Sequence, residues 1–218
     1  MMKKGFIFDL DGVIVDTAKY HYLAWKKLAQ SIDVHFSEAE NEQLKGVSRV
    51  KSLEKILEWG NKTISESDFM KLMALKNDDY LGYINTMNES EILPDVLKVL
   101  KFLIEKEQGI ALGSASKNAR TILKKVNLFH HFEAIVDGND VVKGKPNPEV
   151  FLSAAKALNI NPEHCIVFED SVAGIQAANT ANMISIGIGE SSVLQEADFV
   201  FADFTHINSQ FLNELINK

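Results

Sequence analysis

The sequence is poor in cysteine, in long apolar runs and in positive charge, and each shortage excludes a class of protein. Cys165 is the only cysteine among 218 residues, so an internal disulfide framework is excluded and a reducing cytoplasm is expected. No apolar run reaches the length of a membrane span. Only four uncharged residues separate Lys4 from Asp9, too few for a signal peptide. We therefore expect a cytoplasmic protein with no membrane partner.

The charge balance argues against a nucleic-acid partner. Lysine and arginine number 23 against 30 aspartate and glutamate, and the resulting net charge of −7 still allows a local basic pocket to hold a phosphate. Hydrophobic residues make up 46% and charged residues 24%, as is typical of a soluble globular enzyme. A chain of this length buries a full core, either as one large domain or as a core with an insert.

Two carboxylates directly follow the first predicted strand. The apolar run Phe6 to Phe8 predicts a buried strand, and Asp9 and Asp11 follow it at the carboxyl edge, where open α/β sheets bind ligands. In an extended backbone both side chains share one face, and Gly12 turns the chain away behind them. Such a pair is able to divide the roles of nucleophile and proton carrier.

A pair of acids in this spacing is compatible with two other interpretations. A calcium-binding loop also begins with two acids in this spacing, but it needs glycine at its sixth position and glutamate at its twelfth. Those positions hold Ile14 and Tyr20, so the calcium loop is excluded. The two acids alone are also compatible with a strand that simply ends in polar residues, and the rest of the chain has to decide.

Residues 15–80 show helical patterns only. Apolar residues recur at helical spacing from Ala18 to Ile32, a second pattern runs from the N-cap Ser48 to Gly60, and a third runs from Ser65 towards Tyr83. We expect a helical insert, with residues 1–14 and 81–218 forming the core domain.

Strands and helices alternate from residue 94 onwards. Further strands are predicted at 110–113, 134–136, 166–168 and 184–188. A helix opened by Pro94-Asp95 and closed by Gly109 precedes the first of these, and Asn147-Pro148 and Ser171 cap later helices. The tail after Asp198 predicts only a terminal helix. Such alternation predicts an α/β fold with a doubly wound parallel sheet and helices on both faces.

Polar residues stand at the exits of several strands, where they are expected to meet at one edge of the sheet. They are Asp9, Asp11, Ser114, Lys145, Glu169 and Asp170. Carboxylates are the oxygen ligands that Mg²⁺ prefers, and the hydroxyl and ammonium suit a phosphoryl group. Each residue alone also fits an ordinary turn, a solvated loop or a helix start, so the joint pattern favours the site.

Four motifs occur in order along the chain: Asp9-Leu-Asp11-Gly, Ser114, Lys145-Pro146 and Glu169-Asp170. Together they resemble the motifs of the haloacid dehalogenase superfamily of phosphotransferases. The helical insert resembles the small helical cap domain of that superfamily. Within it, three stretches are similar to the β-phosphoglucomutase family: Asp16 to His21, Leu44 to Arg49, and Ser114 to Asn118. Lys76-Asn-Asp and the run from Glu169 to Gln176 are similar as well.

The resemblance implies roles for the residues of the sheet edge. Asp9 attacks phosphorus, Asp11 moves the proton, and Ser114 and Lys145 hold the transferring phosphoryl oxygens. One Mg²⁺ per chain sits on Asp9, the backbone carbonyl of Asp11 and Asp170, with Glu169 as a ligand or a group that supports the ligands. Fixed cationic partners of this kind stabilise the charge of a loose phosphoryl-transfer transition state.

The resemblance also implies roles for the insert. Arg49, within Gly46-Val47-Ser48-Arg49, grips the phosphate that is not transferred, and Ser116, Lys117 and Asn118 offer a second anion grip at a helix start. Thr17, His21 and Lys76 bring Asp11 into its working position when the cap closes and excludes water. Apart from this resemblance, the sequence indicates only a structural histidine at His21 and ordinary surface lysines at Lys76 and Lys117.

The activity implied is interconversion of β-D-glucose 1-phosphate and D-glucose 6-phosphate by a monomer, with β-glucose 1,6-bisphosphate as the priming phosphate donor. A sugar-phosphate phosphatase shares the core motifs, so Arg49 and the segment around His21 discriminate between the two. A non-catalytic sugar-phosphate sensor is expected to lack Asp9 or Asp11, and both are present.

Overall fold

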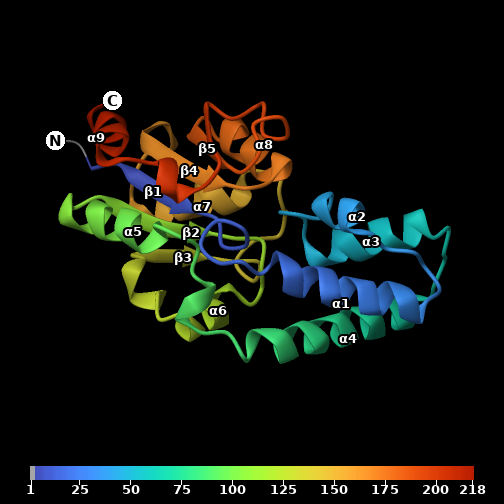
Figure 1. Cartoon of the computed structure of the whole chain (residues 1–218). Helices are drawn as coiled ribbons and strands as arrows, with labels where there is room; N and C mark the ends of the chain where they lie inside the picture. Colours follow the sequence, from blue (N-terminus) through green and yellow to red (C-terminus); the bar gives the residue numbers. More distant parts are fainter. Residues whose placement is uncertain (1–2) are drawn as a thin grey trace.

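The computed structural model describes residues 3–218, and one parallel sheet of six strands forms the centre of this part of the chain (Figure 1). The strands are β1 (Gly5–Phe8), β2 (Gly109–Gly113), β3 (Ala134–Val136), β4 (Cys165–Glu169), β5 (Ile184–Ile188) and β6 (Phe199–Phe201). Their order is β3-β2-β1-β4-β5-β6, and every neighbouring pair is parallel. The predicted doubly wound α/β fold is confirmed, and β1 lies between β2 and β4.

Helices cover both faces of the sheet because its central strands are apolar on both sides. Phe6 and Phe8 face one cluster, to which α5 (Val96–Glu105), α6 (Ala119–Lys125) and α9 (Ser209–Asn217) contribute. Ile7 points the other way, into a cluster shared with α7 (Glu149–Leu158) and α8 (Val172–Thr180). On the first face the rings of Phe8 and Phe168 stack with their centroids 4.7 Å apart.

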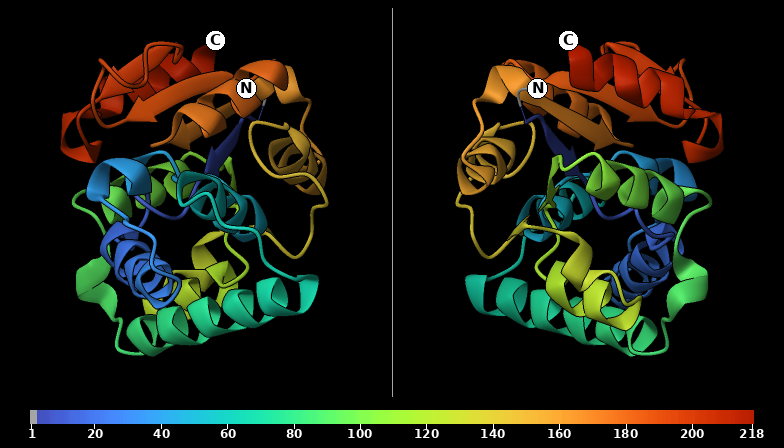
Figure 2. Two further views of the ribbon diagram at one scale, coloured as in Figure 1. Left: turned by 90° about the vertical axis from the view of Figure 1, so that its right-hand side faces the viewer. Right: turned by 90° about the vertical axis from the view of Figure 1, so that its left-hand side faces the viewer.

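Four helices lie between β1 and α5 in the sequence and form a group beside the sheet (Figure 1). They are α1 (Ala18–Ser31), α2 (Glu38–Glu42), α3 (Arg49–Trp59) and α4 (Glu66–Ile84). Helices α1 and α4 pack side by side (Figure 2). These helices bury a hydrophobic cluster of their own around Trp25, Leu53 and Ile56, while the last turn of α4, with Tyr80 and Ile84, belongs to the sheet's cluster.

The predicted helix boundaries hold wherever a serine caps the first turn. Ser48, Ser65 and Ser171 each accept a hydrogen bond from a backbone N–H three residues later, so α3, α4 and α8 begin as expected. Helix α2 was not predicted, although its capping box of Ser37 and Glu40 can be recognised in the sequence.

The prediction that Gly109 closes α5 is wrong. Helix α5 ends at Glu105, and the left-handed turn that follows is made by Glu107, with φ of 53°. Gly109 is the first residue of β2, where a side-chain Cβ would lie 2.9 Å from Ile160 Cδ1, so a larger residue there would have to displace the end of that side chain. Strand β6 was also not predicted. Among residues 3–218, the helices are all too short or too polar to cross a bilayer.

Candidate active site

The predicted polar residues of the core meet at the carboxyl edge of three adjacent strands. Asp9 follows β1, Ser114 follows β2, and Glu169 ends β4, directly before Asp170. Lys145 joins them from the loop between β3 and α7. All of these side chains except Asp170 are buried, and the Asp170 carboxylate is 9% exposed. The topology therefore assembles groups that lie far apart in the sequence.

Lys145 lies between two carboxylates. Its ammonium donates hydrogen bonds to Asp9 Oδ1 and Glu169 Oε1. Burial raises the pKa of Asp9 to about 7, against the opposing charge of Lys145. For Lys145 itself burial acts to lower the pKa, but the two carboxylates outweigh it and raise that pKa. The ion pair thus holds a positive charge beside the carboxylate of Asp9.

Glu169 is fully buried, and both of its carboxylate oxygens have partners. Besides Lys145, it accepts hydrogen bonds from the Ser171 backbone N–H at 2.7 Å and from the Ser171 hydroxyl at 2.8 Å. A Cβ on Gly174 would lie 1.9 Å from the Glu169 carboxyl carbon, so the first turn of α8 leaves space for this side chain. Glu169 is therefore placed to anchor Lys145.

Asp11 lies between the carboxyl edge of the sheet and the group of helices α1 to α4, which is called the insert from here on, with the sheet and its covering helices called the core. Its backbone N–H donates to Asp9 Oδ2 at 3.0 Å, and its Oδ1 accepts a hydrogen bond from the Thr17 hydroxyl. His21 Nε2, on α1, is 3.8 Å from the same Oδ1. Burial raises the pKa of Asp11, while the Thr17 hydroxyl opposes this shift. A raised pKa favours a carboxyl group that is able to donate a proton.

Lys76 reaches the same place from α4 and is only 2% exposed. Its ammonium lies 3.0 Å from His21 Nδ1 and sits over the rings of Trp25 and Tyr80, at 4.7 Å and 4.6 Å from their centroids. Burial and the nearby charge of Arg49 lower the pKa of Lys76 to about 7. Burial also lowers the pKa of His21 well below its usual value, with Lys76 acting in the same direction.

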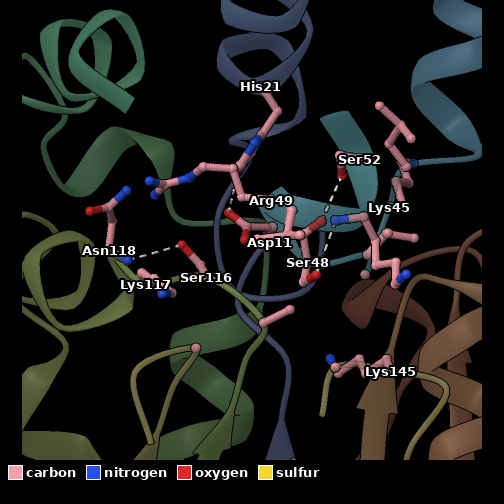
Figure 3. Close-up of a pocket in the computed structure, with 18 of the residues that line it drawn as sticks. Asp11, His21, Lys45, Ser48, Arg49, Ser52, Ser116, Lys117, Asn118 and Lys145 are labelled. Atoms are coloured by element: carbon pink, nitrogen blue, oxygen red, sulfur yellow. Dashed lines mark hydrogen bonds and ion pairs between the residues drawn. The ribbon is translucent and has the colours of Figure 1, made fainter. Parts of the chain in front are cut away.

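A cavity of about 650 Å³ separates the insert from the core, and most of the predicted site residues line it (Figure 3). The predicted residues at its surface are Asp9, Asp11, His21, Gly46, Val47, Ser48, Arg49, Lys76, Ser116, Lys117, Asn118, Lys145 and Asp170. Thr17, Ser114 and Glu169 are absent from the lining and fully buried. The Ser114 hydroxyl accepts a hydrogen bond from the Ser116 backbone N–H at 3.1 Å, so it supports the adjoining loop.

The two groups of residues come close to each other around the cavity. Arg49 reaches in from the first turn of α3, and Lys117 and Asn118 lie in the loop before α6 (Figure 3). Asn118 Nδ2 donates to Asn77 Oδ1 of α4 at 3.2 Å. Gly46, with φ of 69°, lies so close to the core that a Cβ there would be 2.4 Å from the Ser171 hydroxyl. Cationic groups from both sides therefore face one space.

The donor groups fit a magnesium ion. Within residues 3–218, clusters of three or more histidine, cysteine, aspartate or glutamate side chains in metal-binding arrangement are absent. Mg²⁺ is commonly held by one or two carboxylates, with water and substrate phosphate as the other ligands. Burial raises the pKa of Asp170 well above its usual value, and the charges of Glu169 and Asp9 act in the same direction, so negative charge is concentrated at this position. A Cβ on Gly12 would lie 2.2 Å from Asp170 Oδ2, so this glycine leaves space for the carboxylate.

Sequence reasoning missed three residues of the site. Lys45 lines the cavity, and its ammonium is 3.6 Å from Asp170 Oδ2. It directly precedes Gly46 in the segment that resembles the mutases, and this position was the available signal. Trp25 and Tyr80 line the cavity under Lys76, but their apolar helical spacing is the same as that of core residues.

Comparison with known proteins agrees with this geometry. Residues 3–182 match the model of the haloacid dehalogenase-like hydrolase family. The chain is 40% identical over 213 residues to a β-phosphoglucomutase of Bacillus subtilis, covering 97% of this chain and 94% of the relative. It is also similar to a Clostridium difficile β-phosphoglucomutase of known structure, with a TM-score of 0.95 and 41% identity over 99% of this chain and 98% of that one.

A more distant relative has another activity in its name. A phosphorylated carbohydrates phosphatase of Thermotoga maritima is 29% identical over 182 residues, which cover 83% of this chain and 82% of the relative. The family match spans well over half of the chain, and the β-phosphoglucomutase of Bacillus subtilis is similar along nearly all of it. The chain therefore belongs to the haloacid dehalogenase-like hydrolase family, and it is an enzyme of that family.

Proposed function

We propose that this protein interconverts β-D-glucose 1-phosphate and D-glucose 6-phosphate through a phosphorylated Asp9 and a bound β-glucose 1,6-bisphosphate. The main observation in its favour is a single cavity with Asp9 and Lys145 at one part of its wall and Arg49 and Lys117 at another. Such a cavity suits a sugar with two phosphates. The similarity to β-phosphoglucomutases over nearly the whole chain supports the same activity.

The chemistry requires two transfers through one carboxylate. In the first, the 6-hydroxyl of glucose 1-phosphate attacks the phosphorus on Asp9, Asp11 takes the hydroxyl proton, and the bond between phosphorus and Asp9 breaks. The bisphosphate then turns around. In the second, Asp9 attacks the 1-phosphate, the bond to the C1 oxygen breaks, and Asp11 returns the proton to that oxygen. The raised pKa of Asp11 supports its role as the proton carrier.

Charge neutralisation is assigned to fixed groups of the core. Lys145, anchored by Glu169, and the hydroxyl of Ser114 are proposed to hold the transferring phosphoryl oxygens. The carboxylates of Asp9 and Asp170 and the backbone carbonyl of Asp11 are proposed to hold one Mg²⁺, which when bound supplies further positive charge at the phosphoryl group. Glu169 is proposed as a group that anchors Lys145, since both of its oxygens already have partners.

We propose that residues 15–80 act as a cap domain on the core of residues 1–14 and 81–218. Closure is proposed to exclude water from the phosphorylated Asp9, as a mutase requires. In this scheme Thr17, His21 and Lys76 fix Asp11 in position. The residues assigned to the second phosphate and the sugar are Gly46, Val47, Ser48, Arg49, Ser116, Lys117 and Asn118.

The proposal needs one chain only. All of the groups assigned so far come from a single chain, so we propose that the enzyme works as a monomer. Cys165 is buried and unpaired, which is compatible with action in the cytoplasm. The priming phosphate is proposed to come from β-glucose 1,6-bisphosphate.

A sugar-phosphate phosphatase is the alternative, in which water takes the phosphoryl group from Asp9. The relationship to the Thermotoga maritima phosphatase favours it, because the two proteins share the same family core. The two activities differ in what attacks the phosphorylated Asp9, and the products therefore discriminate between them.

The test is to incubate the protein with Mg²⁺, β-glucose 1-phosphate and a trace of glucose 1,6-bisphosphate, and to assay glucose 6-phosphate and free phosphate together. We expect glucose 6-phosphate with no matching release of phosphate. Phosphate released in proportion to the substrate lost would establish the phosphatase instead. Asp9→Asn is the control and is expected to abolish either activity, because an amide does not attack phosphorus. Full turnover by this variant would refute the mechanism.

A further inference from the structure

A buried ion-pair network lies behind the loop of Ser116, Lys117 and Asn118, and the proposed chemistry does not use it. Asp137 leaves the end of β3 and is fully buried. Its Oδ1 accepts hydrogen bonds from the Asn139 backbone N–H at 2.8 Å and from Asn139 Nδ2 at 2.9 Å. Its Oδ2 forms an ion pair with Arg120 of α6. A buried carboxylate with a bound guanidinium is costly to disrupt, so this loop is held firmly.

Arg120 connects three parts of the chain. Its guanidinium donates to the Ile135 carbonyl of β3 at 2.8 Å and to Asp140 Oδ2 at 2.8 Å, in addition to its pair with Asp137. Asp140 Oδ2 in turn accepts a hydrogen bond from the Asp137 backbone N–H at 2.9 Å. The fork of donors on arginine is suited to several acceptors at once, whereas lysine supplies a single point charge.

The loop fixed by this network, residues 137–140, packs directly on the loop of residues 115–118. Asn139 Nδ2 donates to the Lys117 carbonyl at 3.0 Å, and the Gly138 backbone N–H donates to the Ser116 carbonyl at 3.3 Å. A Cβ on Gly138 would lie 2.4 Å from the Ala115 carbonyl oxygen, so the two backbones are in close contact. The conformation of residues 115–118 therefore depends on the network behind it.

We propose that Arg120, Asp137 and Asn139 are positioning residues that hold residues 115–118 ready to bind the phosphate that is not being transferred. This inference rests on the proposed function, which places the second phosphate at these residues. A loop that is already ordered loses less conformational freedom when the ligand binds, and the affinity for that ligand rises accordingly. Within residues 3–218, Asp9, Asp11 and Lys145 form no hydrogen bond with the network, and its one link to the transferring site is the Ser114 hydroxyl, which accepts from the Ser116 backbone N–H. Phosphoryl transfer to Asp9 is therefore expected to depend on the network far less than binding of the second phosphate does.

The test compares a substrate that has a second binding group with one that lacks it. Acetyl phosphate carries a single phosphoryl group, so its hydrolysis through Asp9 does not need residues 115–118. Arg120→Met is expected to raise the KM for β-glucose 1-phosphate about tenfold. This is the effect expected if about two side chains of the loop of residues 115–118 have to be ordered when the ligand binds. The rate of acetyl phosphate hydrolysis is expected to stay within about twofold of wild type, and Arg120→Lys is expected to give an intermediate KM.

Two further variants keep the test decisive. Asn139→Ala removes the hydrogen bond to Lys117 but leaves the ion pair of Arg120 and Asp137, so it tests the contact even if Arg120→Met unfolds. It is expected to raise the same KM severalfold. Lys124→Met removes an exposed charge from the same helix and is the matched control, with no change in KM expected.

The outcomes separate this inference from the proposed function. An unchanged KM in Asn139→Ala, or an equal loss with acetyl phosphate and glucose 1-phosphate, would overturn the positioning role. The nature of the wild-type product, glucose 6-phosphate or free phosphate, decides the proposed function alone. The comparison of KM between variant and wild type can be made with either product.

Discussion

Lys76 is expected to lower the stability of the protein at neutral pH, so Lys76→Met is expected to raise that stability while it abolishes activity. Lys76 is 2% exposed, and its ammonium lies beside His21 and the rings of Trp25 and Tyr80. Burial, together with the charge of Arg49, lowers its pKa from 10.5 to about 7. The unfolded chain keeps the ordinary value, so the unfolded state binds more protons between these two pH values.

The direction and the size of the effect follow from this difference. Because the unfolded state holds the additional proton, the unfolding free energy of the wild type rises as the pH increases from about 7 to 10.5. One pKa unit corresponds to about 1.4 kcal/mol, so the buried ammonium costs the folded state at most about 4 kcal/mol at pH 7 and about 2 kcal/mol at pH 9. Methionine removes this cost, and the contacts of the charged form are already included in the pKa, so they are not subtracted again.

The assay is urea unfolding of wild type and Lys76→Met at pH 7 and pH 9, followed by circular dichroism. We expect the variant to be more stable by up to about 4 kcal/mol at pH 7, with about 2 kcal/mol of that gain lost at pH 9. The difference between the two pH values is independent of how well methionine packs. Lys71→Met, at an exposed lysine of the same helix, is the matched control. A gain of equal size at both pH values would refute the reasoning.

Further perturbations test other parts of the site and the fold. Gly174→Ala places a Cβ 1.9 Å from the Glu169 carboxyl carbon, so it is expected to displace the anchor of Lys145 and to lower kcat at least tenfold; wild-type kcat would contradict this. Leu53→Ala, in the cluster of the insert, is expected to lower the unfolding free energy by about 3 kcal/mol in urea titrations, and a loss below 1 kcal/mol would argue against tight packing there. Arg49→Ala is expected to weaken calorimetric binding of the bisphosphate more than it slows phosphorylation of Asp9, and undiminished affinity would exclude its proposed grip. Chelation with EDTA is expected to stop turnover, and added Mg²⁺ is expected to restore it; turnover that continues in excess EDTA would exclude the metal site.

The sequence was sufficient to predict most of the long helices and the central strands, and the edge at which the site lies. Serine caps such as Ser48 and Ser171 mark helix starts by a local hydrogen bond, and apolar runs such as Phe6 to Phe8 mark buried strands. Because parallel strands end at the same edge, Asp9, Ser114 and Glu169 could be placed together without a structure. The helix and strand predictions depend on residues that are close together in the sequence, where sequence signals are strongest.

The arrangement of side chains within the site was beyond sequence reasoning. Most of α6, a short 3-10 helix (Phe129–His131) and β3 lie between Arg120 and Asp137, and their spacing does not indicate a pair. The two oxygens of Glu169 are bound by Lys145 and by Ser171, which depends on side-chain directions that only packing determines. Glu107, rather than Gly109, makes the left-handed turn after α5, because glycine is favoured in this conformation but not required for it.

The central place of β1 in the sheet has a consequence for the order in which the protein is made. Asp9 is synthesised before its partner Lys145, which is 136 residues further along, and β4, which pairs with β1, follows later still. Until β4 has been synthesised, one edge of β1 has no strand to pair with, and its unpaired backbone groups are open to other chains. A nascent or truncated chain that ends before residue 165 is therefore expected to need a chaperone to stay soluble, and the proposed metal site would be incomplete until Asp170 has been added.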